Sequence, residues 1–413
     1  MKPFAFYLLT VLLFTSCEKK SIDLPLEPVA LNLPEKSAGI IESDNTFGFN
    51  IFRQVVENDD ASNIFISPTS IALALSMTYN GAEGETKTAF ETTLSKQGLT
   101  REEINQSYKA LINALKSVDP RVILEIANSI WYREGFDVLP EFINLNTKYY
   151  NAEVSSLDFA SAEAPSVING WVDDKTHGLI EKIIDNISPD VVMYLINAIY
   201  FKGMWKYEFD ETKTVEAPFY LKDGRTVSND FMNQKITVPY LANEKFRITE
   251  LPYGQGNYSM VILLPNEGYS TADIVSQLTS ENWNQWMGSL YERELNISLP
   301  KLKFSYKNLL NNELTNLGLG IAFTDMADFS GINGTGGLMI SRVLHKSFIE
   351  VNEKGTEAAA VTAVEIILTS LPEEIFVTVN RPYLFALRET TTGAVLFLGM
   401  VQDPTVEDNG NME

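Results

Sequence analysis

The chain has 413 residues, of which 45% are hydrophobic and 21% charged, a composition that fits a globular protein and excludes a disordered or fibrous chain. Lys and Arg number 32 against 54 Asp and Glu, and the net charge of −22 disfavours nucleic acid as a partner because phosphate backbones are also negative. With 1 Cys and 2 His, no internal disulfide and no Cys/His zinc site can form, so we expect no cofactor and leave open only an ion site made of carboxylates.

The N-terminus resembles a bacterial lipoprotein signal. Lys2 supplies one positive charge, an apolar stretch runs from Phe4 to Phe14, and Cys17 follows small residues. This stretch is shorter than the roughly 20 apolar residues that cross a bilayer as a helix. The resemblance implies that residues 1–16 are a signal peptide, and that a lipid on the Cys17 thiol anchors the exported protein at the outer membrane or the cell surface. The competing interpretation is a buried structural cysteine after an uncleaved segment.

Composition divides the rest of the chain into three parts. Residues 17–40 contain several prolines and indicate a flexible, extended tether. Residues 41–405 show no linker-like shift in composition, so we expect one compact domain. Residues 406–413 are acidic and are expected to form a frayed tail.

Helix signals come first along the domain and strand signals dominate later. Asn45 can cap one helix, and Ser67 followed by Pro68 predicts a second helix that ends near Asn80. Runs of apolar, β-branched and aromatic residues predict strands at 122–132, 191–201, 258–264, 375–379, 383–388 and 394–401. The second of these runs hardly alternates, so we expect both of its faces to be covered. The fold class is α+β.

Several polar residues near these elements are candidates for a functional cluster. Asn197 interrupts an apolar strand, and a buried amide without partners costs about 1–3 kcal/mol, so we expect it to have hydrogen-bond partners. Ser70 and His345 are further candidates. Ser67 has a simpler explanation as the cap of the second helix.

The stretch from Glu353 to Ser370 is the most informative segment. Read with a period of two, the charges that follow Gly355 all fall on one face of the stretch. The opposite face carries Thr356, Ala358, Ala360, Thr362, Val364 and Ile366. Because no proline occurs before Pro372, the backbone could form a full hydrogen-bond ladder as a central strand. Its alanines also favour a helix. The residues alone support a spare strand no better than an amphipathic helix or a plain surface loop.

Over residues 41–405 the chain resembles the serpin family, whose motifs occur along it in order. They lie at 63–71 (NIFISPTSI), 196–205 (INAIYFKGMW), 299–301 (LPK), 343–346 (VLHK), 353–362 (EKGTEAAAVT), 380–383 (NRPY) and 397–401 (FLGMV). The resemblance implies a monomer with three β-sheets, eight or nine helices and an exposed reactive-centre loop at about residues 353–380.

The resemblance also implies roles for individual residues, none of them catalytic. Trp205 matches the aromatic residue of the breach, where the loop enters the central sheet, and Lys301 matches a partner of Glu353 in a salt bridge at the base of the loop. A polar cluster beneath the sheet, the shutter, would contain Ser67, Ser70, Asn197 and His345. The hinge of the loop would consist of Glu353, Gly355, Thr356, Glu357, Ala358, Ala359 and Ala360.

The mechanism that the resemblance implies is single-use inhibition of serine endopeptidases, and also of cysteine endopeptidases. The protease cuts the loop and becomes acylated, the cut loop inserts into the central sheet, and the attached enzyme is deformed before water releases it. About a dozen new backbone hydrogen bonds at about 0.5–1.5 kcal/mol each would release on the order of 10 kcal/mol. This free energy is large enough to distort a partner.

The position of the cut follows from the family's hinge. The sixteenth residue after Glu353 is Thr369, which places the reactive bond at Thr369–Ser370, whereas counting back from Asn380 gives Leu371. Residues Ile367, Leu368 and Leu371 would flank the bond. Because no Lys or Arg occurs between Lys354 and Arg381, trypsin-like proteases find no charge to bind. We expect elastase-like and subtilisin-like targets, and papain-like enzymes as further candidates.

Two other functions compete with inhibition. A non-inhibitory serpin that carries a ligand or serves as a structural protein would have bulky, charged or proline residues in its hinge, and this hinge is composed mainly of small residues. A hydrolase would combine a serine with His177 or His345, and the sequence contains no Gly-x-Ser-x-Gly motif. His177 is better explained as a turn residue, and we expect that the protein is not an enzyme.

Overall fold

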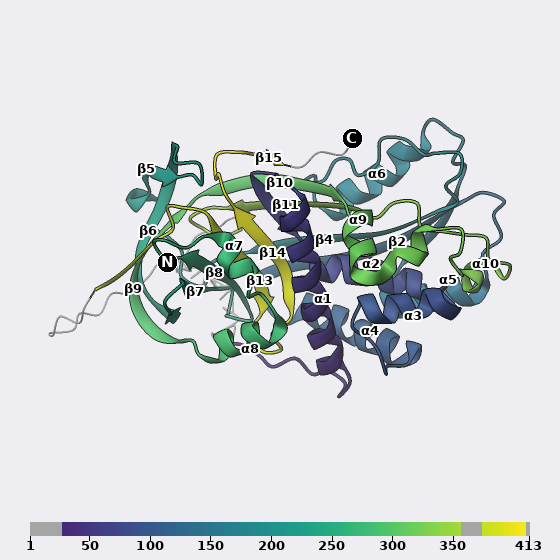
Figure 1. The fold of residues 1–413 in the computed structure, drawn as a ribbon, viewed down its shortest axis with the longest axis horizontal. Coiled ribbons are helices and arrows are strands. Elements are labelled where there is room, and N and C mark those ends of the chain that lie inside the picture. The colour runs from purple at the N-terminus through teal and green to yellow at the C-terminus, as the bar shows by residue number, and fades with distance from the viewer. Residues whose placement is uncertain (1–26, 357–373, 410–413) are drawn as a thin grey trace, which may run out of the picture.

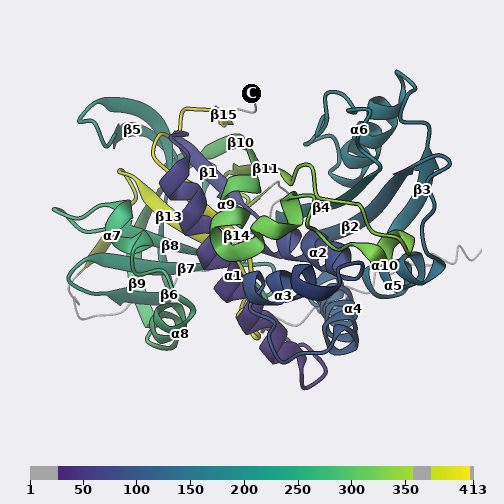
Figure 2. The same cartoon turned by 45° about the vertical axis from the view of Figure 1, so that its right-hand side comes forward.

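The computed structural model describes residues 27–356 and 374–409. Figures 1 and 2 show one body in which helices pack around three β-sheets, in agreement with the predicted α+β class. The predicted signal peptide, Cys17, hinge residues 357–360, the bond at Thr369–Ser370 and its flanking residues all lie outside the described residues.

The described residues contain ten α-helices, where the family resemblance implies eight or nine. They are α1 (Ser37–Asn58), α2 (Pro68–Tyr79), α3 (Gly84–Thr93), α4 (Arg101–Ser117), α5 (Pro140–Tyr150), α6 (Ala164–Lys175), α7 (Thr271–Val275), α8 (Ser280–Gly288), α9 (Asn311–Leu314) and α10 (Ser330–Asn333). Short helical turns of other types are labelled η1 (Glu211–Lys213), η2 (Thr315–Leu319) and η3 (Gly320–Phe323). Because α9 and α10 are single turns of 4 residues each, the larger number reflects short turns between longer elements.

The largest sheet has nine strands and contains four of the predicted ones. Its order is β1 (Asn63–Ile66), β14 (Val395–Val401), β13 (Tyr383–Glu389), β8 (Tyr258–Pro265), β7 (Phe246–Tyr253), β6 (Thr226–Ala242), β9 (Tyr291–Pro300) and β12 (Ile375–Thr378), with β5 (Val215–Tyr220) paired to β6. β8, β13 and β14 are buried along nearly their whole length.

Two further sheets of three strands each lie beside the large one. The first has the order β3 (Glu153–Leu157), β2 (Val122–Arg133) and β4 (Met193–Gly203), and the second has the order β11 (Leu344–Val351), β10 (Leu302–Leu309) and β15 (Asp408–Asn409). β2 and β4 confirm the remaining two predicted strands. Figure 2 shows α6 lying over the outer face of the first small sheet, and α2 packs against its inner face, so both faces of β4 are covered as predicted.

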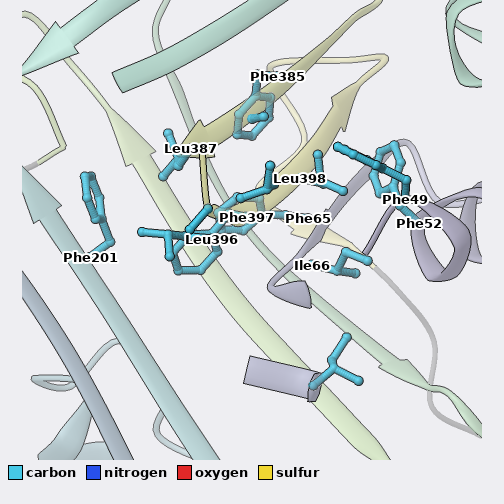
Figure 3. Close-up of a cluster of buried hydrophobic side chains, with 14 of the residues drawn as sticks. Phe49, Phe52, Phe65, Ile66, Phe201, Phe385, Leu387, Leu396, Phe397 and Leu398 are labelled. Atoms are coloured by element: carbon cyan, nitrogen blue, oxygen red, sulfur yellow. The ribbon is translucent and has the colours of Figure 1, made fainter. Parts of the chain in front are cut away.

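The larger of two hydrophobic clusters among the described residues connects the sheets, and aromatic rings lie in it (Figure 3). Phe65 on β1 stacks on Phe397 of β14, with ring centroids 5.0 Å apart, and lies 5.5 Å from Phe385 of β13. Phe201 on β4 contacts the edge of Phe397 at 6.5 Å. Since each buried aromatic side chain contributes about 1.5–3 kcal/mol, this contact between sheets is a main source of stability.

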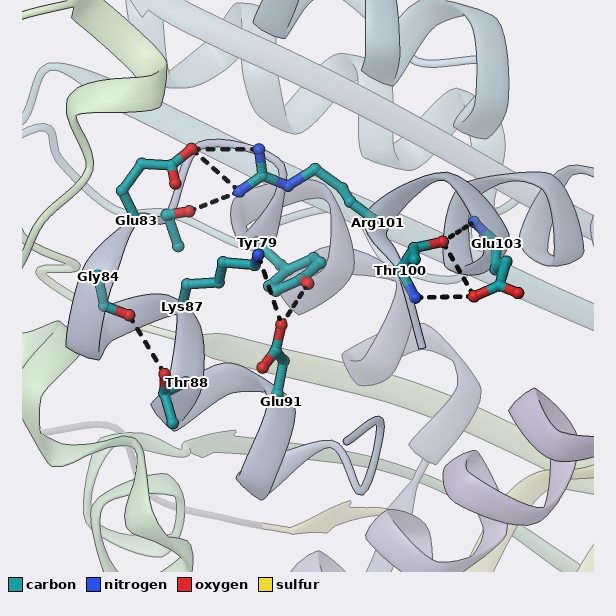
Figure 4. Close-up of polar contacts among 10 residues, drawn as sticks. Tyr79, Glu83, Gly84, Lys87, Thr88, Glu91, Thr100, Arg101 and Glu103 are labelled. Carbon is teal, nitrogen blue, oxygen red and sulfur yellow. Dashed lines mark hydrogen bonds and ion pairs between the residues drawn. The ribbon is translucent and has the colours of Figure 1, made fainter. Parts of the chain in front are cut away.

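Polar contacts hold the helices α2, α3 and α4 together at their ends (Figure 4). Thr100 and Glu103 form a capping box that starts α4. Next to it, the guanidinium group of Arg101 donates to Glu83 at 3.1 Å and lies 5.4 Å from the ring centroid of Tyr79. The turn between α3 and α4 is therefore fixed by both a cap and a cation.

The start of the domain differs from the prediction. α1 begins at Ser37, so residues 37–40 belong to this helix and not to the tether. Asn45 lies inside α1 and does not cap it. Its amide nitrogen donates to the carbonyl of Gly393 at 2.9 Å, and its side-chain oxygen accepts from the amide of Val395 at 3.0 Å. These tertiary bonds explain a buried asparagine in mid-helix.

The segment before α1 follows the surface of the domain. The backbone amide and carbonyl of Val29 both bond the side chain of Asn257, at 2.9 and 2.7 Å. Leu31 and Leu33 pack against the core. The described end of the predicted tether is therefore docked.

The opposite end of the chain also differs from the prediction. Asp408 and Asn409 form β15 beside β10, whereas the sequence indicates a frayed tail from residue 406. Within the described residues, no helix is long and apolar enough to cross a membrane.

Candidate functional site

The edge strand β4 of one small sheet lies opposite the edge strand β11 of the other. We term the gap between these two strands the slot. Among the described residues, β4 has the single strand neighbour β2, and β11 has the single strand neighbour β10. A pocket of about 30 Å³ lies between β4 and β11. It is lined by Ile199, Tyr200 and Phe201 of β4, by Phe348, Ile349 and Glu350 of β11, by Thr176, Leu179 and Ile180 of the connection after α6, and by Phe65, Thr356, Leu387 and Phe397. The slot thus lies over the aromatic core of the protein.

Backbone hydrogen bonds join the two small sheets at one end of the slot. The amide of Thr356 donates to the carbonyl of Gly203 at 2.7 Å, and the amide of Trp205 donates to the carbonyl of Lys354 at 2.9 Å. Gly355 pairs with Met204 in antiparallel orientation, with a φ of 133°. A Cβ on Gly355 would lie 2.2 Å from the carbonyl oxygen of Gly203, so only glycine permits this close approach. The predicted hinge therefore begins inside the slot.

Trp205 lies at this joined end, as its match to the breach predicts. Its ring is stacked on Tyr253 with centroids 4.3 Å apart, and its indole nitrogen donates to the carbonyl of Asn352 at 2.9 Å. The hydroxyl groups of Tyr253 and Thr356 are 3.3 Å apart. Trp205 and Tyr253 thus form a rigid aromatic floor under the first hinge residues.

The predicted salt bridge at the base of the loop is present. The ammonium nitrogen of Lys301 lies 3.2 Å from a carboxylate oxygen of Glu353, and the hydroxyl of Thr214 donates to that carboxylate at 2.7 Å. Burial raises the pKa of Glu353, but the hydrogen bonds from Thr214 and Lys301 outweigh it and hold the pKa below its ordinary value. Glu353 is therefore a fixed negative charge at the point where the chain leaves β11.

The structure brings three of the four predicted shutter residues together. The backbone amide of Ser67 donates to Nε2 of His345 at 3.2 Å, and the hydroxyl of Ser67 accepts from the amide of Ser70 at 3.1 Å, which confirms Ser67 as the helix cap. The same hydroxyl donates to the carbonyl of Leu396 at 2.8 Å. Ser67 therefore caps α2 and also bonds the predicted shutter residue His345.

The fourth shutter residue, Asn197, belongs to the other side of the slot. Its amide nitrogen donates to Oδ1 of Asn128 on β2 at 2.7 Å, and Asn128 in turn donates to the carbonyl of Tyr150 at 2.7 Å. The side-chain oxygen of Asn197 is buried and has no hydrogen-bond partner among the described residues. The predicted shutter residues are thus divided: Asn197 lies on β4, and His345 of β11 is bonded to Ser67 at the start of α2.

His345 is buried on β11, and burial lowers its pKa from 6.5 to about 4. The imidazole is therefore neutral at physiological pH, and its Nε2 atom serves as the acceptor for Ser67. Protonation would remove that acceptor and bury a charge beside the slot.

The connection from α6 to β4 lies across the slot and contacts both of its sides. His177 has a φ of 53°, which suits a turn. The centroid of its ring lies 4.6 Å from that of Tyr200, and its Nε2 atom lies 3.4 Å from a carboxylate oxygen of Glu125. On the other side, the Lys346 ammonium group of β11 donates to the carbonyl of Lys182 at 3.1 Å. A strand that entered the slot would have to displace this connection.

Sequence reasoning missed two residues of this site. Asn128 interrupts an apolar strand as Asn197 does, so the same signal could have identified it. Tyr253 carries no comparable local signal, because its role comes from contacts with Trp205 and Thr356, which are distant in the chain.

The described residues offer no catalytic or metal centre at the slot. His345 accepts from a backbone amide, His177 contacts a carboxylate and a tyrosine ring, and neither is bonded to a serine hydroxyl in the described part of the chain. No group of three or more His, Cys, Asp or Glu side chains there could hold a metal ion.

Comparison with known proteins agrees with this geometry. A family model described as "Serpin (serine protease inhibitor)" matches residues 42–404. The human leukocyte elastase inhibitor is 38% identical over 382 residues, covering 88% of this chain and 99% of that protein, and Iripin-8 of Ixodes ricinus is 34% identical over 378 residues, covering 88% and 93%.

Solved structures show the same fold. The native thermophilic serpin tengpin is 34% identical with a TM-score of 0.81, and the alignment covers 92% of this chain and 97% of tengpin. Human thyroxine-binding globulin in complex with its ligand is 30% identical with a TM-score of 0.81, covering 90% and 100%. With its open slot, its hinge and a family match over nearly all of the domain, the chain belongs to the serpin family of protease inhibitors.

Proposed function

We propose that this serpin is a single-use inhibitor of serine endopeptidases that traps the acylated protease by inserting its cleaved loop into the slot. The observation that carries the proposal is the antiparallel pairing of Gly355 with Met204 at the joined end of the slot. This pairing sets the register in which the following residues would continue as a strand beside β4.

That register spans the whole of β4. Paired residue numbers in an antiparallel ladder have a constant sum, and 204 and 355 give 559. Thr356 therefore faces Gly203, and Ile366 would face Met193, so that residues 356–366 match the 11 residues of β4. The residues between the hinge and the proposed cut at Thr369 are therefore numerous enough to pair with the whole of β4.

The two faces of the inserted strand would also suit their surroundings. Residues opposite each other in a ladder point to the same side, so Ala358 would lie beside Phe201 on the core side. The glutamates at 357 and 365 would lie on the outer side, with Glu357 opposite Lys202. β4 and β11 could then both complete their backbone hydrogen bonds. A dozen such bonds would release a free energy on the order of 10 kcal/mol.

The reactive bond of this inhibitor is Thr369–Ser370, with Leu371 as the alternative to Thr369. Threonine and leucine fit the small apolar specificity pockets of elastase-like and subtilisin-like enzymes, and papain-like cysteine proteases are further candidates. The similarity to a leukocyte elastase inhibitor supports the first of these target classes.

The test is a panel of elastase, subtilisin, papain and trypsin incubated with the full chain. We expect adducts that resist SDS with elastase or subtilisin, close to one inhibitor molecule used per enzyme silenced, and mass spectrometry that places the cut after Thr369. Adducts with trypsin alone would contradict the specificity, and cleavage without adducts by every enzyme would contradict inhibition itself.

The alternative function is a non-inhibitory serpin that binds a ligand or serves as a structural protein, and the thyroxine-binding globulin neighbours, solved in complex with thyroxine, bind a ligand on the same fold. The melting temperature before and after loop cleavage separates the two functions. An inserting loop raises it by many degrees because the sheet gains a strand, whereas a loop that stays outside leaves it unchanged.

We further propose that a lipid on Cys17 anchors the protein at the outer membrane or the cell surface. The chain from Cys17 to the docked Val29 has 12 steps and reaches at most about 40 Å, so the domain would stay close to the bilayer. Membrane fractionation tests this proposal: the chain should partition with membranes and a Cys17→Ser variant should be soluble. Equal partitioning of the two proteins would contradict anchoring.

A further inference from the structure

The C-terminal segment runs from the end of β14 to the outer edge of β10, as Figure 1 shows. β10 pairs with β11 on one side and with β15 on the other, where Ser305 faces Asp408 and Tyr306 faces Asn409 in parallel register. The amide of Ser305 also donates to the carbonyl of Glu407 at 2.8 Å. The segment thus adds a strand to the outer edge of the sheet that forms one wall of the slot.

One buried side chain makes four hydrogen bonds to this segment. Asn63 at the start of β1 is fully buried, and its amide nitrogen donates to the carbonyls of Asp403 and Val406 at 2.7 and 3.2 Å. Its side-chain oxygen accepts from the amides of Gln402 and Asp403 at 3.0 and 3.1 Å. All four bonds go to backbone atoms of residues 402, 403 and 406. They therefore fix the path of the chain whatever side chains these residues carry.

The residues of β15 have little tendency to form a strand, which suggests that β15 pairs with β10 because of the path that the chain follows. Aspartate and asparagine are among the residues that are least common in strands. They are also suited to an edge, because charged residues on an outer strand prevent another strand from adding to it. Glu407 is exposed and Asp408 follows it, on a molecule whose net charge is already −22. Two copies that approached each other at this edge would therefore repel.

We propose that residues 402–409 are an edge cap that keeps the sheet of β10 and β11 from pairing with a second copy of this chain. Without β15, Ser305 and its neighbours would present backbone donors and acceptors along an open sheet edge, which is a template for an extended segment of another molecule. The role goes beyond protease inhibition and does not depend on it.

The test compares the full chain with three variants. A chain that ends at Thr405 lacks β15, and a chain that ends at Asn409 keeps it and serves as the matched control. The variant Asn409→Pro keeps the length and the charge but lacks the amide hydrogen that the edge ladder needs. Each protein is incubated below its unfolding temperature at several concentrations, and oligomers are measured by size-exclusion chromatography with light scattering.

We expect the chain ending at Thr405 and the Asn409→Pro variant to form oligomers about tenfold faster than the full chain, increasingly so at higher concentration, because several edge hydrogen bonds are lost. The chain ending at Asn409 should behave as the full chain does. Equal rates for the chains ending at Thr405 and Asn409 would overturn the proposal. If the shorter chain does not fold, Asn409→Pro decides: a folded, monomeric variant refutes the cap, and a folded variant that oligomerises supports it.

Discussion

The amide of Thr356 lies 2.7 Å from the carbonyl oxygen of Gly203, so one hydrogen bond of the proposed inserted strand exists before any protease has acted. Thr356 is buried, and its hydroxyl lies beside that of Tyr253 above the aromatic floor of the slot. Because the strand has already started at this residue, insertion after cleavage would extend an existing ladder and displace the connection between α6 and β4. This contact makes Thr356 the residue at which insertion is most easily blocked.

Replacing Thr356 by Arg should turn the inhibitor into a substrate. A guanidinium group at this position would be buried beside the ring of Tyr253, at a cost of several kcal/mol, and insertion would stop at its first residue. We expect normal cleavage at the reactive bond and almost complete loss of SDS-resistant adducts with elastase. Thr356→Ser keeps the hydroxyl and should inhibit normally. An arginine variant that still forms adducts efficiently would show that the loop does not insert through this end.

The register from Gly355 and Met204 makes opposite predictions for two adjacent alanines. Ala358 would face Phe201 in the core, and Ala359 would face Tyr200 on the outer side near His177. Ala358→Glu should therefore raise the number of inhibitor molecules used per enzyme at least about tenfold, since a carboxylate would enter the core. Ala359→Glu should raise it less, because the outer side is lined by the polar groups of Tyr200 and His177 and not by the aromatic core. The reverse order would mean that the register is shifted by one residue.

The residues that the sequence identified are those whose roles depend on near neighbours in the chain. The adjacent Pro68 predicts Ser67 as a cap, and the residues of 122–132 by themselves predict the strand that the structure has at Val122–Arg133. The hinge residues Glu353 and Gly355 required the family resemblance. The same kind of local signal failed at Asn45, where bonds to Gly393 and Val395 override helix capping.

Features that depend on distant segments could not be predicted from the sequence. The slot exists because β4 and β11, far apart in the chain, face each other without forming one sheet. The division of the shutter between Asn197 and His345 follows from that gap. β15 pairs with β10 after Asn63 has bonded the segment that precedes it, and no propensity of Asp408 or Asn409 indicates a strand.

Removing Asn128 should destabilise the protein through its neighbours. Asn128→Ala leaves the amide of Asn197 and the carbonyl of Tyr150 without their present partners, and each buried polar group of this kind costs about 1–3 kcal/mol. We expect a lower melting temperature for Asn128→Ala. The double variant with Asn197→Ala should lose less stability than the sum of the single variants, because the two residues share one hydrogen bond. Additive losses would show that their bond does not contribute.

His345 should make stability depend on pH in the mildly acidic range. Its pKa in the folded protein, about 4, lies below its ordinary value of 6.5, so the folded state binds fewer protons than the unfolded state between these pH values. Stability is fully present above pH 6.5 and falls as the pH approaches 4, by about 3 kcal/mol for this depression of the pKa. Urea unfolding of His345→Gln across this range should show a correspondingly flatter pH dependence, and identical slopes for both proteins would contradict the assignment.

The ion pair between Lys301 and Glu353 should stabilise the base of the loop only when Glu353 is ionised. The folded-state pKa of Glu353 lies below its ordinary value of 4.5, so its contribution is present above that pH and is lost as the pH falls through the lower folded value. Lys301→Met should therefore lower stability at pH 7 by about 1 kcal/mol, a modest value because the lysine is partly exposed. The difference in melting temperature between the two proteins should shrink toward zero in acid, since the carboxylate is then neutral in both. A difference that stays constant down to pH 3 would mean that Lys301 acts through packing of its alkyl chain and not through its charge.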